Sequence, residues 1–410
     1  MNQNKLPFRN SQIRIGIDNG HSTSKVLYYL VENNRLKYSV VRPEYICLSP
    51  ENAPNLPNGG TVPENLAWIQ YTKGGDCHLI GQLAKSYSSL MDFNSPKINS
   101  LIPKILAIVG AICLKEETSS VVAIDLIILT PWGEYPKINS HLEKLEKDIR
   151  KALQSFYFQG QKFLVSLNSF SLLPEASGLA IFDQLLDKNS QYKRHYYFMV
   201  GDKTASGLYF ADGLIVPEFS MTCDLAFNDL AHKFLTLVPS LDKASLSRAI
   251  STKLVKTRTL TSNDTFVSST QVDWESLVRD SDRRTAAELE QNFEIALNQF
   301  WLVMAQKLNA TLPLGHHLHS VTRCGGTTDF LMPKLKQYFT NTALKTPSTV
   351  ASSLVKALEI DRNHDLAVEF FRLNFPLRFA DIWAAMLTLA GLFPLYWHEH
   401  DEIRQKAEIS

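Results

Sequence analysis

A polar bend near the start of the sequence holds residue types that bind phosphate. It runs through Asp18, Asn19, Gly20, His21, Ser22, Thr23, Ser24 and Lys25. Alternating apolar residues on both sides predict two β-strands joined by a tight turn, where amides, hydroxyls, a carboxylate and an ammonium can converge on one phosphate. Gly20 would admit an anion close to the backbone, Lys25 would neutralise its charge, and Asp18 would hold a hydrated Mg²⁺. An ordinary hairpin is the alternative, because Asp-Asn-Gly is also a common turn sequence.

The rest of the chain must fold around this bend, and its length and composition limit how. A chain of 410 residues predicts two domains, and 45% apolar with 20% charged residues is typical of a globular protein. The formal net charge of +1 gives no general attraction to nucleic acid. We therefore expect no direct nucleic-acid binding, and any link to DNA would be local or through a partner.

Cysteines and apolar runs indicate the compartment. The five cysteines are scattered without a Cys-x-x-Cys pair, and residues 1–10 contain no apolar export segment. The apolar run 101–114 is too short to cross a bilayer, and the run 382–397 contains Gly391 and Pro394. We expect both runs to form core helices, with no membrane span, in a reduced cytoplasmic protein.

Strand-like and helix-like stretches alternate along the chain, which indicates α/β architecture. A second hairpin, 196–216, suggests two topologically related halves, and a polar helical stretch, 225–282, with breaks over 257–270 suggests an inserted subdomain. A long helix over 286–308 then leads to a strand that ends at a double glycine, 325–326. The other main predictions are helices over 101–114 and 141–156 and strands over 121–129 and 162–167.

The order of these motifs resembles the actin-like ATPases of the sugar kinase, Hsp70 and actin superfamily, most closely the ParM/StbA branch. The matching motifs are Asp18-x-Gly20 with Lys25 for phosphate, Pro174-Glu175-Ala176 as the connection, Cys324-Gly325-Gly326-Thr327 for adenosine, and Phe379-Ala380-Asp381 with Gly391 at the close. Shorter matches are Gly81 with Ala84, and Leu129-Thr130-Pro131. Together the landmarks cover nearly the whole chain.

The resemblance implies ATP or ADP and Mg²⁺ as cofactors and assigns roles to particular residues. It implies metal binding by Asp18 and Asp202, and catalysis by Asp202 and by Glu175, which would place the attacking water. The implied nucleotide contacts are Asp18, Gly20, His21, Ser22, Thr23, Lys25, Lys203, Thr204, Gly325, Gly326 and Thr327. Glu175 also suits the first turn of a helix, and Lys203 and Thr204 also suit a hairpin turn.

One motif departs from the family pattern. Relatives carry Asp-x-Gly-Gly-x-Thr at the second phosphate turn, whereas this chain reads Val200-Gly201-Asp202-Lys203-Thr204. If the hairpin keeps its usual length, Val200 stands in place of the metal-binding Asp and Asp202 in place of a glycine. If the turn is two residues shorter, Asp202 itself takes the metal role. Loss of the carboxylate would slow hydrolysis by about 10² to 10³ while leaving nucleotide binding possible.

These observations predict an α/β, actin-like fold of two domains with a nucleotide cleft between related halves. The expected domains are 1–173, with 372–410 returning to it, and 174–371, with an inserted subdomain near 226–294. The predicted function is a nucleotide-dependent ATPase that forms head-to-tail filaments, acting in plasmid DNA segregation through a DNA-binding adaptor or as a bacterial cytoskeletal element. The alternatives are a non-hydrolysing nucleotide-binding scaffold and a small-molecule kinase of the same superfamily.

Overall fold

The computed structural model describes residues 11–20, 23–52, 56, 63–87, 100–187, 189, 192–257, 265–281, 284–313, 317–358 and 378–392. The described residues fall into two compact units. The first takes its residues from Met1–Thr130, Glu134–Pro174 and Leu389–Leu392, and the second from Pro131–Gly133, Glu175–Thr388 and Phe393–Ser410.

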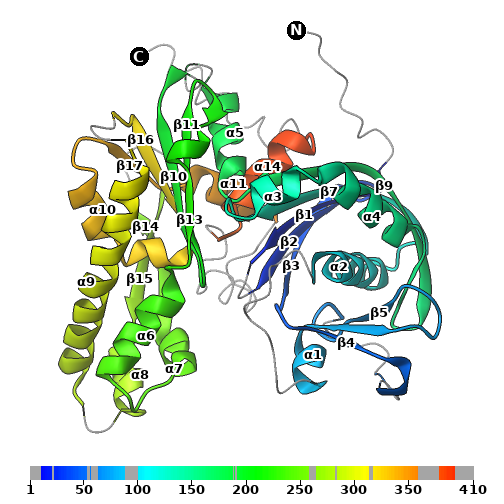
Figure 1. Ribbon diagram of the computed structural model, residues 1–410, viewed down its shortest axis with the longest axis horizontal. Helices are drawn as coiled ribbons and strands as arrows, with labels where there is room; N and C mark the ends of the chain where they lie inside the picture. Colours follow the sequence, from blue (N-terminus) through cyan, green and yellow to red (C-terminus); the bar gives the residue numbers. More distant parts are fainter. Residues whose placement is uncertain are drawn as a thin grey trace. The chain divides into compact units, whose positions relative to one another are not determined.

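The first unit is built on a mixed sheet of nine strands in the order β3-β2-β1-β7-β9-β8-β5-β6-β4. Its strands are β1 (Ile13–Asn19), β2 (Ser24–Leu30), β3 (Arg35–Val41), β4 (Tyr45–Leu48), β5 (Trp68–Gln70), β6 (Cys77–Ile80), β7 (Val121–Thr130), β8 (Phe156–Phe158) and β9 (Gln161–Pro174). Its helices are α1 (Gln82–Tyr87), α2 (Leu101–Lys115), α3 (Tyr135–Asn139) and α4 (Leu142–Gln154). The sheet curls around α2, as Figure 1 shows. The predicted elements of this half are therefore present, with β9 longer than expected.

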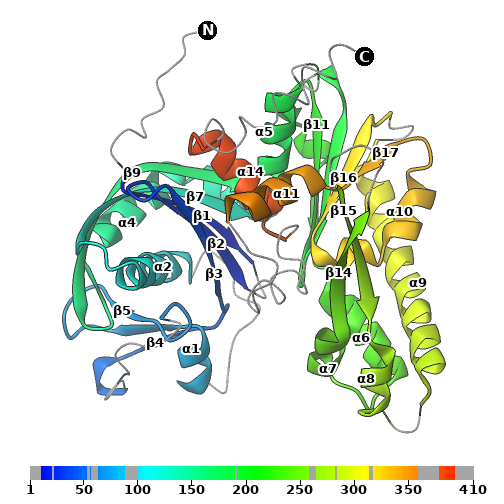
Figure 2. The ribbon, with the colours of Figure 1, turned by 180° about the vertical axis from the view of Figure 1, so that it is seen from behind.

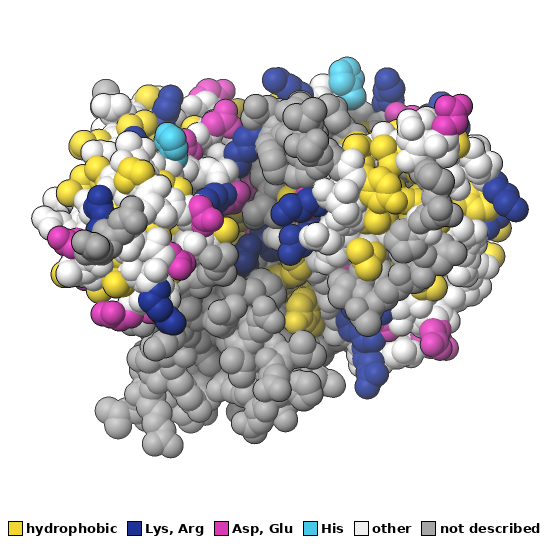
Figure 3. Space-filling model, turned by 90° about the horizontal axis from the view of Figure 1, so that it is seen from below, with side chains coloured by type: hydrophobic (Ala, Val, Ile, Leu, Met, Phe, Trp, Pro, Cys, Tyr) yellow, Lys and Arg dark blue, Asp and Glu magenta, His cyan; other side chains and the backbone are white. Residues whose placement is uncertain are grey.

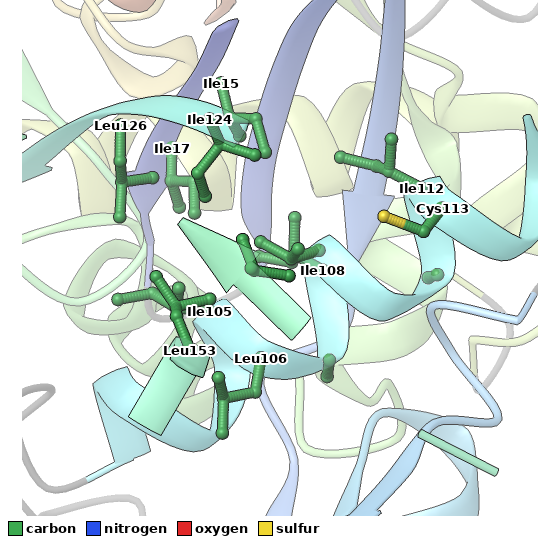
Figure 4. Close-up of a cluster of buried hydrophobic side chains, with 14 of the residues drawn as sticks. Ile15, Ile17, Ile105, Leu106, Ile108, Ile112, Cys113, Ile124, Leu126 and Leu153 are labelled. Atoms are coloured by element: carbon green, nitrogen blue, oxygen red, sulfur yellow. The ribbon is translucent and has the colours of Figure 1, made fainter. Parts of the chain in front are cut away.

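The core of the first unit explains the apolar run at 101–114. Nearly every residue of α2 is buried, because strands of the curled sheet surround the helix. Figure 4 shows side chains of α2 packed against those of β1, β7 and α4, with labels on Ile15, Ile17, Ile105, Leu106, Ile108, Ile112, Cys113, Ile124, Leu126 and Leu153. Among the described residues, no helix combines the length and the apolar character that crossing a bilayer requires.

The second unit has a sheet in the order β12-β11-β10-β16-β17, with β13 paired to β11, and a separate two-stranded ladder of β14 and β15. Its strands are β10 (His195–Val200), β11 (Ala205–Ala211), β12 (Leu214–Ile215), β13 (Met221–Cys223), β14 (Ile250–Thr257), β15 (Thr265–Val272), β16 (Ser320–Cys324) and β17 (Ala343–Lys345). Its helices are α5 (Ser177–Leu186), α6 (Phe227–Leu237), α7 (Lys243–Ala249), α8 (Trp274–Val278), α9 (Ala286–Thr311), α10 (Met332–Tyr338), α11 (Ser348–Ala357) and α14 (Ala380–Leu389).

The two sheets share one strand pattern. In each, an antiparallel hairpin (β1–β2 or β10–β11) extends to a further antiparallel strand, β3 or β12, on one side. On the other side, the first strand of each hairpin pairs in parallel with β7 or β16. That strand in turn pairs in parallel with β9 or β17. Two halves with one topology are what the repeated hairpin signal predicted.

One prediction about the second half needs correction. The stretch expected to be helical with breaks over 257–270 contains the ladder β14–β15, because its residues are rich in β-branched Ile, Val and Thr, which favour strands. Within the segment 372–410, Leu389–Leu392 group with the first unit and Ala380 to Thr388 with the second. In the second unit, Trp383 of α14 donates a 2.9 Å hydrogen bond to Ser353 of α11.

Candidate phosphate and adenosine loops

The first candidate loop is the turn of the hairpin β1–β2. The strands pair Asp18 with Lys25 and Asn19 with Ser24, which leaves residues 20–23 as the turn. Lys25 forms an ion pair with Asp18, and the carboxylate is almost fully buried, with Asp18 only 3% exposed. The Ser24 hydroxyl donates a 3.1 Å hydrogen bond to Asn19. The predicted carboxylate and ammonium are therefore neighbours at the mouth of the turn.

Gly20 is required by space at this turn. A Cβ at this position would lie 2.3 Å from the carbonyl oxygen of Thr23, which is closer than real contacts allow. The Gly20 amide donates a 2.9 Å hydrogen bond to the Asp18 carbonyl. His21 and Ser22, also predicted to contact phosphate, lie outside the described residues. The glycine thus lets the backbone fold tightly beside Asp18.

The second candidate loop is the turn of the hairpin β10–β11. The last strand pair is Val200 with Ala205, so the turn is residues 201–204, equal in length to the first. The Gly201 amide donates a 3.0 Å hydrogen bond to the Thr204 carbonyl, which closes the turn. Lys203 and Thr204 lie within it and are partly buried. The two hairpin turns therefore have the same length.

The register also shows which residues correspond in the two hairpins. When the turns are matched residue by residue, Met199 takes the position of Asp18, and Ser206 takes that of Lys25. In this matching Val200, which the sequence suggested in place of the metal-binding Asp, takes the position of Asn19. The second hairpin therefore lacks both members of the first hairpin's ion pair.

Asp202 lies in the second turn and contacts the helices α6 and α7, which follow this turn in the sequence. Its Oδ1 is 2.9 Å from Nζ of Lys243, the first residue of α7, and Lys243 also donates to Asn228 of α6. Backbone bonds fix the turn as well, since the amides of Phe227 and Asn228 donate to the carbonyls of Gly201 and Asp202 at 3.1 and 2.8 Å. Sequence reasoning missed Lys243 and Asn228, because nothing in their spacing pointed to this turn.

The predicted adenosine motif lies directly beside the second hairpin. Strand β16 pairs in parallel with β10 and is followed by Gly325, whose φ of +83° favours glycine. A Cβ on Gly325 would lie 2.4 Å from the Val200 carbonyl, while one on Gly326 would meet nothing within 4 Å. The Thr327 hydroxyl donates a 3.1 Å hydrogen bond to the Gly201 carbonyl. The backbone of the motif thus packs against the second turn on one side and is open at Gly326. We call this stretch of backbone the Gly325–Gly326 shelf.

Glu175 lies at the junction between β9 and α5 and is buried, with 6% of its surface exposed. The next residue, Ala176, has a left-handed φ of +75°. Asp381 of α14 accepts hydrogen bonds from the amides of Ala176 and Leu179 at 2.5 and 3.2 Å, so it caps the start of α5. The sequence marked Asp381 only as part of the closing motif, and its capping role was not predicted.

The helix that follows Glu175 is anchored to the hairpin strand β10. Tyr197 donates a 2.7 Å hydrogen bond to the Asp183 carboxylate on α5. Burial raises the pKa of Asp183, and the hydrogen bond from Tyr197 partly offsets that rise. The Glu175 junction is therefore held from both sides, by α14 and by the sheet.

The structure brings the predicted residues together in separate groups. Asp18, Gly20, Thr23 and Lys25 share the first turn, while Asp202, Lys203, Thr204, Gly325, Gly326 and Thr327 gather around the second. In the part of the chain that the structure describes, no group of three His, Cys, Asp or Glu side chains could hold a metal ion. On the face in Figure 3, Lys and Arg side chains stand among Asp and Glu. Both groups offer amides and ammonium groups, the chemistry that binds phosphate.

Three solved structures share the arrangement of this chain. The apo pSK41 ParM protein has a TM-score of 0.55 at 11% identity, covering 92% of this chain and 97% of that one. The Alp12 filament structure also has 0.55, at 10% identity, covering 94% and 100%. Ta0583, an archaeal actin homolog in complex with ADP, has 0.52 at 13% identity, covering 91% and 97%. No family model and no curated protein matches the sequence.

At such low sequence identity the structural similarity shows only the fold. The similarity extends over nearly the whole chain. The protein has an α/β actin-like fold. Within that class, its fold is of the ParM type. This confirms the fold predicted from the order of the motifs.

Proposed function

We propose that this chain binds an adenine nucleotide and assembles into nucleotide-dependent, head-to-tail filaments. The observation that carries nucleotide binding is the Gly325–Gly326 shelf, which packs against the second turn and is open at Gly326, where a Cβ would meet no atom of the described residues within 4 Å. An open glycine shelf lets a flat nucleoside lie against the backbone. The fold supports the proposal, because Ta0583 is solved with ADP and Alp12 as a filament.

In this proposal each hairpin turn provides groups that contact phosphate. Gly20 and Lys25 would bind from the first turn, and Lys203 and Thr204 from the second. Asp18 is the carboxylate that fits Mg²⁺, since it is a hard oxygen donor next to a turn that accepts anions. When bound, Mg²⁺ would neutralise phosphate charge. Glu175 and Asp202 would be the groups nearest the chemistry, as the resemblance implies.

Nucleotide binding is tested by filling the shelf. The variant Gly326→Val adds a side chain whose Cβ lies within 4 Å of no atom in the described part of the chain, so we expect an unchanged melting temperature. If the adenosine lies there, affinity for a fluorescent ATP analogue should fall at least about tenfold. Unchanged affinity would contradict the proposed site, and a lowered melting temperature would show that Gly326 serves packing instead.

Assembly and hydrolysis are tested by measuring phosphate release from Mg-ATP over a series of protein concentrations, with electron microscopy of the same samples. Head-to-tail contacts do not close on themselves, so a filament-forming ATPase should show turnover above a threshold concentration. Turnover merely proportional to protein would indicate an ATPase or kinase that does not polymerise.

A specific observation favours the second candidate, a nucleotide-binding scaffold that does not hydrolyse ATP. Met199 occupies the position that corresponds to Asp18, and Asp202 is paired with Lys243. If the missing carboxylate prevents turnover, Met199→Asp should raise phosphate release by about tenfold or more. Met199→Asn is the matched control, since it places a side chain of the same size at the same position without the negative charge. Equal effects of the two variants would contradict a role for the carboxylate.

The cellular role we propose is plasmid DNA segregation through a DNA-binding adaptor, or a cytoskeletal function in the cell body. The net charge of +1 supports an adaptor over direct DNA binding. The measurement is co-sedimentation of filaments with DNA, with and without candidate adaptors. Salt-resistant DNA binding by the filaments alone would contradict the need for an adaptor.

A further inference from the structure

Helix α9 has an outer face that its own unit leaves uncovered. The helix begins with a capping box, in which Thr285 and Glu288 exchange side-chain-to-backbone hydrogen bonds at 3.2 and 2.7 Å. Its inner face buries Leu289, Phe293, Ala296, Leu297, Phe300, Met304 and Leu308. In Figures 1 and 2, α9 lies at the outer edge of the drawing, with elements of its unit on one side only.

The outer face carries apolar and amide side chains. Leu302 is 65% exposed and Ile295 is 40% exposed, two turns apart on the same side of the helix. Exposed amides surround them, from Gln291, Asn298, Gln299 and Gln306. No residue from 295 to 306 is charged. A solvent-facing helix surface normally carries Lys and Glu, so this stretch resembles a surface that is covered in solution.

We propose that a second copy of this chain covers the face, through an antiparallel α9–α9 contact around a two-fold axis. An axis between residues 298 and 299 would pair Ile295 of each copy with Leu302 of the other. The same axis would pair Gln291 with Gln306 across the contact. These four side chains point to the outer side of the helix, so one operation matches apolar with apolar and amide with amide.

A copy of the chain suits this face better than a partner of different chemistry. A charged partner would find no opposite charge between residues 295 and 306 to pair with. An entirely apolar partner would leave the amides without hydrogen bonds. Amide side chains carry both donors and acceptors, so they can pair with copies of themselves. The contact is isologous and closes with two copies, unlike the head-to-tail contact, and it needs no nucleotide.

The test is site-specific disulfide formation without nucleotide. Both variants, Ile295→Cys and Leu302→Cys, carry Cys47→Ser, because Cys47 is the exposed native thiol. In the proposed register position 302 faces 295 of the other copy, while each position lies about 10 Å along the axis from its own equivalent. Disulfides need shorter spans, so we expect a crosslinked dimer only when the two variants are mixed.

Two outcomes would overturn the proposal. Efficient crosslinking of either variant alone would indicate a different arrangement, and absence of crosslinks in the mixture would remove the contact. Sedimentation velocity of uncrosslinked protein gives the second measurement, in which Leu302→Glu should weaken dimerisation by about tenfold or more. Leu214→Glu is the matched control, since Leu214 is 71% exposed on β12. A monomeric wild-type protein, or equal effects of both variants, would contradict the contact.

Discussion

The hairpins β1–β2 and β10–β11 have the same turn length, the same leading glycine and the same kind of parallel neighbour, yet they hold their charges in different ways. The first places Asp18 opposite Lys25 within its own strands, where the pair is largely buried. The second has Met199 and Ser206 at those positions, and its acid, Asp202, is in the turn and paired with Lys243 of α7. The same hairpin backbone therefore holds its charged residues in two different ways.

This difference indicates that the described residues of the first hairpin pair their charges within their own strands, whereas the second turn depends on its neighbours. The second turn is fixed by backbone bonds to the start of α6, by the ion pair to α7 and by the hydroxyl of Thr327. A change in α6 or α7 would therefore reach the second turn directly. We therefore expect a change in α6 or α7 to affect the proposed nucleotide through Asp202 and the backbone beside it.

The largest expected effect comes from removing the lysine of each pair. Lys25→Ala leaves the Asp18 carboxylate buried without its cation, which should cost about 3 kcal/mol of unfolding free energy. Lys243→Ala should cost less than about 1 kcal/mol, because the Asp202 side chain is 22% exposed and water can solvate it. Urea unfolding followed by circular dichroism measures both.

The control for this pair is the double variant Asp18→Asn with Lys25→Met. It removes both charges, so most of the stability lost in Lys25→Ala should return. If the double variant is as unstable as the single one, the cost lies in lost packing rather than in the unpaired charge. A larger loss from Lys243→Ala than from Lys25→Ala would reverse the comparison.

A smaller difference in stability is expected between variants of Gly20 and Gly201, the first residue of each turn. Gly20→Ala would place a Cβ 2.3 Å from the Thr23 carbonyl, and we expect it to cost about 2 kcal/mol. Gly201→Ala would place its Cβ 3.3 Å from the Thr204 carbonyl, which a small shift relieves, so the cost should stay below about 1 kcal/mol. Thermal melting of the two variants tests this, and equal shifts would mean that the turns are equally tight.

The elements of both hairpins were predictable from the sequence because their signals are local. Alternating apolar residues around a glycine specify two strands and a turn, and a double glycine after a strand marks a close backbone approach. The helix α2 was equally clear from its apolar run, in which Lys104 is the one charged residue. The ladder β14–β15 was missed, since its polar and β-branched residues suit either a broken helix or an edge pair until the partner strand is known.

The contacts of the site were less predictable because they join distant parts of the chain. Asp202 and Lys243 are separated by 41 residues and the Asp381–Ala176 bond spans 205, so no spacing rule connects them. The correspondence of Met199 with Asp18 needed the strand register, which one sequence does not fix to the residue. Motif order located the loops, and tertiary contacts determined which side chains serve them.

The smallest expected effect isolates the neighbour's contribution to the second turn. Thr327→Val removes the 3.1 Å hydrogen bond to the Gly201 carbonyl at nearly constant volume, which should cost about 1 kcal/mol. Thr322→Val on β16 is the matched control, because the Thr322 hydroxyl is buried without a hydrogen-bond partner, so its removal should be neutral or stabilising. If the second turn depends on its neighbours as argued, Thr327→Val should also speed amide hydrogen exchange of Gly201 and leave that of Gly20 unchanged. An equal change in exchange at the two glycines would contradict the dependence of the second turn on Thr327.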